Sequence, residues 1–99
     1  SSSYVLVGTP QAMAETWGST CHGAGRLMSR SAATRRFSAN DVVETLRQRG
    51  VYIRAASREG IIEEAPGAYK DVDEVVGVAH GAGISKLVAK LKPVGVMKG

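Results

Sequence analysis

The sequence predicts an α+β fold in which short helices and strands are mixed along one small chain. Apolar runs rich in β-branched residues, which are typical of strands, occur near both ends and in the middle of the chain. Segments with apolar residues at helical spacing follow residues that commonly cap a helix. With 43% hydrophobic residues, the 99-residue chain can build a modest core. The order of strands within a sheet does not follow from these patterns.

The first two elements are predicted to be a strand and a short helix. Residues 4–7 are Tyr-Val-Leu-Val and are closed by Gly8, which favours a buried strand. Thr9 can cap a helix, and Pro10 is a preferred residue at the first helical position. We therefore expect a helix over 11–17, followed by a loop.

A second helix is predicted from about Ala24 to about Thr34. Its narrow inward stripe consists of Leu27, Met28, Ser31 and Ala32. Arg26 and Arg30 are one turn apart, so in this helix they share a face that leans toward the helix start. Their guanidinium groups would then flank a ligand bound at the helix N-terminus.

The third helix is predicted to begin with a capping box and to end at Gly50. Ser38 can accept a hydrogen bond from the first turn, and Asp41 is the acid three residues later. The core-facing residues of this helix are Val42, Val43 and Leu46. A glycine such as Gly50 commonly follows the last helical turn.

Two strands and a loop are predicted in the middle of the chain. Residues 51–55 and 60–62 are strand candidates, separated by a turn at 57–59. Residues 63–69, with the sequence Glu-Glu-Ala-Pro-Gly-Ala-Tyr, are predicted to form an extended loop that contains a proline.

The last third of the chain predicts a helix and a β-rich tail. Asp71 and Glu74 form a second capping box. The core-facing stripe of this helix consists of Val72, Val75, Val76 and Ala79. Lysine and apolar residues alternate over 86–92, which suits a strand with one solvent-exposed face. Pro93 breaks this strand before the final segment 94–99.

The composition excludes several classes of protein. No apolar run approaches the roughly 18 residues that cross a bilayer, and no signal segment opens the sequence. The single cysteine cannot form an internal disulfide, which suits a reducing compartment. We therefore expect a soluble protein of the cytoplasm. Because the first residue is serine rather than methionine, we also expect a truncated or processed chain.

The basic residues are compatible with an anionic partner, since the formal net charge is +4. Four arginines follow one another without an intervening acidic residue: Arg26, Arg30, Arg35 and Arg36. A solvent-exposed helix face explains such a run equally well.

The tetrapeptide His-Gly-Ala-Gly occurs twice, at 22–25 and at 80–83. His80 follows an apolar helix, so we expect it at a helix C-terminus, where the helix dipole repels phosphate. His22 precedes a predicted helix N-terminus, where glycines and free N–H groups let a phosphate approach closely. The imidazole of His22 could bind this phosphate or attack its phosphorus atom. The alternative is a histidine that only caps the helix.

The other candidate residues are weaker on local chemistry alone. Cys21 and His22 are adjacent, so their side chains diverge, and the sequence shows no complete metal site. Tyr69 could stack on a base or only anchor its loop. Lys98 precedes the last residue and would ordinarily belong to a frayed end. Neither a P-loop nor a GxGxxG motif is present.

The sequence resembles the RtcB family of RNA-splicing ligases along its whole length. Residues 18–26 (Gly-Ser-Thr-Cys-His-Gly-Ala-Gly-Arg) and 28–30 (Met-Ser-Arg) closely resemble the active-site segment of that family. The other matching segments are 3–8, 63–72 and 93–99. The resemblance implies that residues 1–99 are the C-terminal segment of the larger RtcB-type catalytic domain and not a complete domain.

The resemblance also implies an activity, a GTP- and Mn²⁺-dependent RNA ligase that acts in tRNA splicing and RNA repair. Members of the family join RNA ending in a 2′,3′-cyclic phosphate or 3′-phosphate to RNA beginning with a 5′-hydroxyl. The histidine that matches His22 attacks the α-phosphorus of GTP and forms a histidine–guanylate intermediate. Guanylate then passes to the RNA 3′-phosphate, and the 5′-hydroxyl displaces it. The implied partners are GTP, RNA such as tRNA exon halves, the upstream part of the same protein and an archease-type activator.

Individual residues receive roles from the same resemblance. His22 is the catalytic residue. The residues that match guanylate contacts are Ser3, His22, Gly23, Ala24, Gly25 and Lys98, and we expect Tyr69 at the base. Arg26 and Arg30 are assigned to a phosphate of RNA or GTP. The manganese ligands of the family lie upstream of this sequence, and the second tetrapeptide, at His80, has no role in the family.

Three interpretations follow. The first is a ligase segment that is inactive when isolated, because it lacks the metal ligands. The second is a non-catalytic phosphate- or RNA-binding module that uses the basic helix after His22, whose RNA binding would be salt-sensitive and independent of that histidine. The third is an incompletely folded piece with an exposed sheet edge.

Overall fold

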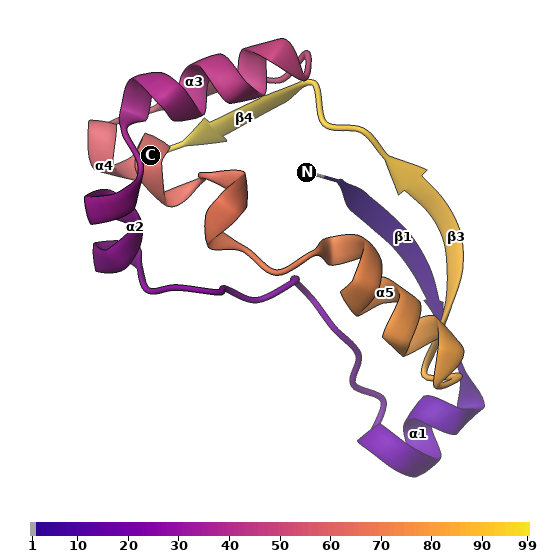
Figure 1. Cartoon of the computed structure of the whole chain (residues 1–99). Helices are drawn as coiled ribbons and strands as arrows, with labels where there is room; N and C mark the ends of the chain where they lie inside the picture. The colour runs from indigo at the N-terminus through magenta and orange to yellow at the C-terminus, as the bar shows by residue number, and fades with distance from the viewer. Residues whose placement is uncertain (1) are drawn as a thin grey trace. The chain divides into compact units, whose positions relative to one another are not determined.

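The computed structural model describes residues 2–99 and confirms the α+β prediction, with helices and strands mixed along the chain (Figure 1). In chain order the elements are β1 (Ser3–Gly8), α1 (Pro10–Thr16), α2 (Arg30–Arg36), α3 (Ala39–Gln48), β2 (Tyr52–Ala55), α4 (Arg58–Glu63), the 3₁₀ helix η1 (Pro66–Ala68), α5 (Val72–Gly81), β3 (Ser85–Leu91) and β4 (Gly95–Lys98). The chain divides into two compact units. The first unit comprises residues 2–25 and 70–92, and the second comprises residues 26–69 and 93–99.

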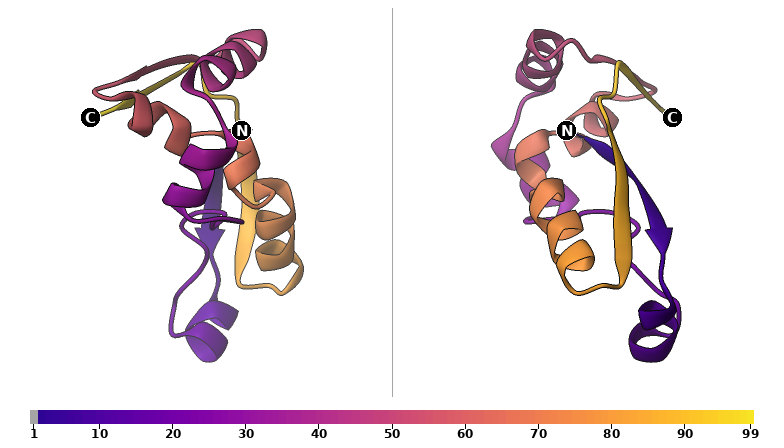
Figure 2. Two further views of the ribbon diagram at one scale, coloured as in Figure 1. Left: turned by 60° about the vertical axis from the view of Figure 1, so that its left-hand side comes forward. Right: turned by 90° about the vertical axis from the view of Figure 1, so that its right-hand side faces the viewer.

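The first unit is built on an antiparallel pair of strands. β1 and β3 lie side by side, from the pair Ser3–Leu91 to the pair Gly8–Ser85 (Figures 1 and 2). Thr9 caps α1 as predicted, because its hydroxyl oxygen accepts a hydrogen bond from the backbone N–H of Ala12. The same hydroxyl donates to the carbonyl oxygen of Gly83 over 2.6 Å, so the start of α1 is also tied to the turn before β3.

The helix of the first unit, α5, is also capped as the sequence predicts. The Asp71 carboxylate accepts a hydrogen bond from the N–H of Asp73, and the stripe residues Val76 and Ala79 are buried. β3, by contrast, is exposed along its whole length after Ser85, where the sequence predicts only one exposed face. The difference arises because a two-stranded ribbon has few neighbours that could cover its apolar face.

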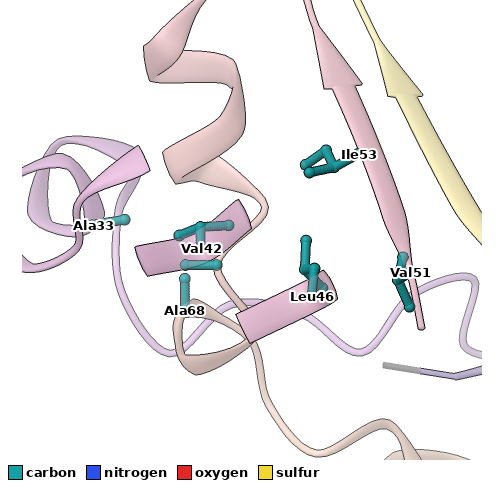
Figure 3. Packing of buried hydrophobic residues seen from close by; sticks show 7 residues of the cluster. Ala33, Val42, Leu46, Val51, Ile53 and Ala68 are labelled. Carbon is teal, nitrogen blue, oxygen red and sulfur yellow. The ribbon is translucent and has the colours of Figure 1, made fainter. Parts of the chain in front are cut away.

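The second unit contains the largest buried apolar cluster of the described residues. Val42 and Leu46 of α3 pack with Val51 and with Ile53 of β2 (Figure 3). The other members are the small residues Ala33, Ala65 and Ala68. β2 pairs in parallel with β4, from the pair Tyr52–Gly95 to the pair Ala55–Lys98. The predicted Ser38 cap of α3 is confirmed, and Gly50 follows the helix with a positive φ of 74°.

The predicted start of the second helix is wrong. α2 begins at Arg30, not at Ala24, and Ser29 caps it by accepting a hydrogen bond from the N–H of Ala32. The segment before it is a loop in which Gly25 has a φ of +79°, outside the helical region. The serine cap and this glycine therefore define the helix start, because both are incompatible with a continuous helix from residue 24. As a result, Arg26 is not on a helix, and the tetrapeptide at His22 does not precede a helix N-terminus.

The predicted strand at 60–62 is also wrong. These residues belong to α4, which Ser57 caps by accepting a hydrogen bond from the N–H of Gly60 over 3.0 Å. The β propensity of two adjacent isoleucines is outweighed by this local cap. The predicted loop at 63–69 contains the single 3₁₀ turn of η1. Within the described part of the chain, no helix is long and apolar enough to span a membrane.

Candidate functional site

The loop that carries His22 is fixed at both ends within the first unit. Before the histidine, the Thr20 hydroxyl donates to the Ser85 hydroxyl over 3.3 Å, and Ser85 is only 1% exposed. After the histidine, the carbonyl oxygen of Gly25 accepts a hydrogen bond from the N–H of Lys70 over 2.9 Å. The His22 side chain lies between these two anchors and is exposed. An exposed imidazole on an anchored loop can act as a nucleophile toward a bound electrophile.

Two glycines of this loop differ in backbone conformation and in the space around them. Gly25 has a φ of +79°, a conformation that residues with a side chain adopt at a cost, and a Cβ there would lie 3.8 Å from the Lys70 side chain. Gly23 has no atom within 4 Å of a Cβ position and no positive φ. Gly25 therefore shapes the loop, whereas Gly23 leaves its backbone open to an approaching molecule.

The second tetrapeptide has a different environment, as expected. His80 lies in the last turn of α5, which confirms its predicted place at a helix C-terminus. Its Nδ1 accepts a hydrogen bond from the backbone N–H of Leu87 over 3.1 Å. This contact ties α5 to β3, so His80 has a structural partner that His22 lacks among the described residues.

Arg26 links two segments of the second unit. Its Nε donates to the carbonyl oxygen of Met28 over 3.0 Å, and its Nη1 donates to that of Glu63 over 3.2 Å. Its guanidinium carbon lies 4.7 Å from the centre of the Tyr69 ring. Nη2 is buried and has no hydrogen-bond partner within residues 2–99. Most of this guanidinium group is therefore committed to contacts inside the unit.

Arg30 and Lys98 converge on two adjacent carboxylates at the end of α4. The Arg30 Nε lies 3.3 Å from Glu63 Oε2, and the Lys98 Nζ lies 3.7 Å from the same oxygen. Lys98 also donates to Glu64 Oε1 over 2.5 Å. This hydrogen bond raises the pKa of Lys98 above its ordinary value, because the carboxylate stabilises the ammonium form.

The sequence alone does not assign a role to Glu63 or Glu64. The only sequence signal for them was a pair of adjacent acids within a segment that resembles the family. Their partners are remote in sequence, since Glu64 and Lys98 are 34 positions apart, so local patterns do not reveal the contact. Lys98 is thus part of an ion-pair cluster rather than the frayed end that its position suggested.

The predicted site residues are divided between the two units. The first unit contains Ser3, His22, Gly23, Ala24 and Gly25, and the second contains Arg26, Arg30, Tyr69 and Lys98. Ser3 is exposed on β1, where it pairs with Leu91. In the second unit, Arg30 and Lys98 meet at the carboxylates of Glu63 and Glu64, and Arg26 reaches the Glu63 carbonyl oxygen. Tyr69 contacts Arg26. Among the described residues of the first unit, no side-chain hydrogen bond links Ser3 to the His22 loop.

In the part of the chain that the structure describes, the residues able to bind a metal do not form a site. Among residues 2–99, no group of three or more His, Cys, Asp or Glu side chains gathers as metal ligands would. Cys21 is a free, half-buried thiol whose Sγ lies 4.0 Å from the Thr20 hydroxyl oxygen. The described residues therefore do not fit Mn²⁺ by themselves.

Comparison with known proteins identifies relatives along the whole chain. Residues 1–99 match the family model described as tRNA-splicing ligase RtcB. The tRNA-splicing ligase RtcB of Pyrococcus furiosus is 61% identical over 97 residues, which are 98% of this chain and 10% of that protein. The proteins of the same name from Methanopyrus kandleri and Archaeoglobus fulgidus are each 59% identical over 97 residues. These residues make up 10% and 20% of the two proteins, so the chain spans only a small part of the relatives that it matches.

Proposed function

Because the chain belongs to the tRNA-splicing ligase RtcB family, we propose that it is a segment of an RNA ligase and carries the nucleophile of that enzyme. The observation that carries this proposal is the exposed His22 on a loop anchored at both ends, within the segment that most resembles the family's active site. The ligase joins RNA 2′,3′-cyclic phosphate or 3′-phosphate ends to 5′-hydroxyl ends.

The proposed reaction begins with the nucleophilic attack of a neutral imidazole nitrogen of His22 on the α-phosphorus of GTP. A phosphorus–nitrogen bond forms, the bond to the bridging oxygen breaks, and pyrophosphate leaves. The guanylate passes from His22 to the RNA 3′-phosphate, which restores the free imidazole. The 5′-hydroxyl of the second RNA then attacks this activated phosphate, and guanylate leaves as the strand is sealed.

The remaining residues receive binding roles. The backbone at Gly23 is open enough for close approach of a phosphate. Arg30 is 70% exposed and uses only Nε in its ion pair, so its other donors can reach a phosphate of RNA or GTP. Arg26 is the weaker phosphate ligand, because two of its nitrogens are hydrogen-bonded inside the unit. The residues proposed to contact guanylate are Ser3, His22, Gly23, Ala24, Gly25, Tyr69 and Lys98.

The partners of the proposed ligase follow from its family. GTP is the guanylate donor, and RNA such as tRNA exon halves is the substrate. Mn²⁺, with ligands outside this chain, would neutralise the triphosphate. The rest of the ligase polypeptide and an archease-type activator complete the list, and we expect the enzyme to act in the cytoplasm.

The proposal is tested by mass spectrometry on the intact ligase polypeptide that contains this segment. The protein is incubated with GTP and Mn²⁺, and any adduct is located by peptide mapping under non-acidic conditions. We expect one guanylate on His22 that is absent in His22→Ala. His80→Ala is the matched control, because it changes the same tetrapeptide in its other environment and should still form the adduct.

Two outcomes would overturn the proposal. One is the absence of an adduct, and the other is an adduct on His80 or Lys98 instead of His22. The non-catalytic RNA-binding module would then be the better account. That module predicts RNA binding that weakens steeply with salt and does not change in His22→Ala.

A further inference from the structure

The carboxylates of Glu63 and Glu64, at the end of α4, are less exposed than the cations that they contact. The side chains of Glu63 and Glu64 are 23% and 24% exposed, whereas that of Lys98 is 36% exposed and that of Arg30 is 70% exposed. Glu63 contacts both cations, whereas Glu64 contacts only Lys98. Arg30 therefore faces solvent, and Lys98 is half-buried but still more exposed than either carboxylate.

Both cations keep donors that these ion pairs do not use. The Arg30 guanidinium has five N–H groups and uses Nε in its contact with Glu63. The Lys98 ammonium has three N–H groups and contacts two carboxylate oxygens. Within residues 2–99, no other side-chain partner occupies the remaining donors. An anion arriving from solvent would thus meet two cations whose side chains are already oriented by their carboxylate partners.

The position of the carboxylates in their own helix is unfavourable. Glu63 is the last residue of α4 and Glu64 is its C-cap, where the partial negative charge of the helix end repels acidic side chains. Exposed ion pairs also contribute little to stability. Two acids at this position are therefore not explained by the local helix, which is consistent with a role toward the cations.

We propose, on the basis of the ligase function above, that Glu63 and Glu64 are positioning residues that orient Lys98 and Arg30 toward phosphates of the guanylate donor. The hydrogen bond of Glu64 with Lys98 also raises the pKa of that lysine, so the neutral amine, a minor form at neutral pH, becomes rarer still. Lys98 then acts as a phosphate-binding cation, not as a competing nucleophile, and the attack on phosphorus is left to His22.

The first test compares the guanylation kinetics of the intact ligase with those of Glu64→Gln. The substitution removes a negative charge next to the anionic ligand, so the KM for GTP should fall or stay constant. Because Lys98 is no longer oriented, kcat should fall by about tenfold. A residue with only a structural role would not lower kcat while the KM for GTP stays constant or falls. Glu64→Asp retains the charge, so its kcat should lie between that of Glu64→Gln and that of the wild type.

The second test measures the amine of Lys98 directly and does not depend on activity. Only a neutral amine reacts with acetic anhydride, so competitive acetylation followed by peptide mass spectrometry reports the protonation of each lysine. In the wild type at pH 9, Lys98 should react more slowly than exposed Lys92. In Glu64→Gln, the labelling of Lys98 relative to Lys92 should rise by about threefold or more. The wild-type comparison applies even where the variant does not fold.

A control variant separates this proposal from general effects of charge. Glu59 lies in the first turn of the same helix, is exposed, and has no ion pair among the described residues, so Glu59→Gln should match the wild type in both tests. A wild-type enzyme without a His22 adduct would contradict the ligase function itself. If the wild type forms the adduct but Glu64→Gln has the same kcat and the same Lys98 labelling as the wild type, only the positioning role is overturned. Equal labelling of Lys98 and Lys92 in the wild type would also overturn it.

Discussion

The hydroxyl group of Thr20 donates a hydrogen bond to the buried hydroxyl of Ser85, and this contact ties the start of the His22 loop to the first residue of β3. The two residues are 65 positions apart. A nucleophile gains from a fixed geometry, because small misplacements of a reacting group reduce the rate strongly. The Thr20–Ser85 contact therefore connects the first sheet to the proposed chemistry.

We expect Ser85→Ala to slow guanylation of His22 by about fivefold, because the loop loses one of its two anchors. The cost in the free energy of unfolding should be only about 1 kcal/mol, since Thr20 is exposed and its hydroxyl can bind water instead. Rates of adduct formation by mass spectrometry measure the first effect. Thr20→Ser keeps the hydroxyl and should retain nearly the wild-type rate. Equal rates in Ser85→Ala and the wild type would show that the contact does not position the loop.

The two glycines of the loop should respond differently to alanine. Gly25→Ala forces a side chain into a positive φ and should lower the free energy of unfolding by about 1–2 kcal/mol. Gly23→Ala meets no neighbouring atom and should change this free energy by less than about 0.5 kcal/mol. Urea denaturation of both variants measures the difference. A Gly25→Ala variant as stable as Gly23→Ala would contradict the loop conformation described above.

The Ser57 cap at the start of α4 should affect the ion pairs of Glu63 and Glu64 at the end of that helix. Ser57→Ala removes the acceptor for the N–H of Gly60 and should destabilise the helix by about 1 kcal/mol. Because α4 ends at Glu63 and Glu64 is its C-cap, fraying of the helix should also increase the acetylation of Lys98. Hydrogen exchange of the α4 amides and lysine labelling measure the two effects. Ser31→Ala changes an exposed serine of α2 and should leave both unchanged.

A cluster on the first unit predicts a pH dependence of stability. Lys90 and Tyr4 both donate to the Asp73 carboxylate, over 2.8 Å and 2.6 Å, and these hydrogen bonds lower the pKa of Asp73. Since the folded-state pKa is depressed, the stabilisation is present above the unfolded pKa of about 4. It is lost as the pH falls through the lower, folded-state value.

Asp73→Asn should therefore be less stable than the wild type at pH 7, and the difference should shrink as the pH falls below the unfolded pKa of about 4. Thermal unfolding as a function of pH measures this difference. Glu74→Gln is the neighbouring control, because Glu74 has no ion pair within residues 2–99 and should not share the trend. A difference that persists unchanged at low pH would exclude the carboxylate as its source.

The sequence predicts most elements of this fold because their signals are local. Thr9, Ser38 and Asp71 each accept a hydrogen bond two or three residues ahead, so the starts of α1, α3 and α5 are evident from neighbouring residues. The two wrong elements have the same cause. Ser29 and Ser57 are also caps, but the stripe that begins at Leu27 predicted a longer helix and the adjacent isoleucines predicted a strand.

Some contacts of the candidate site cannot be predicted from local sequence patterns. The composition of the His22 segment and its resemblance to the ligase family follow from the order of residues alone, as does the difference between His22 and His80. The anchoring of the loop by Ser85 and the convergence of Arg30 and Lys98 on Glu63 and Glu64 depend on folding, because the partners are far apart in sequence. Short-range caps are encoded by adjacent side chains, whereas ion pairs between remote segments exist only once packing has brought their backbones together.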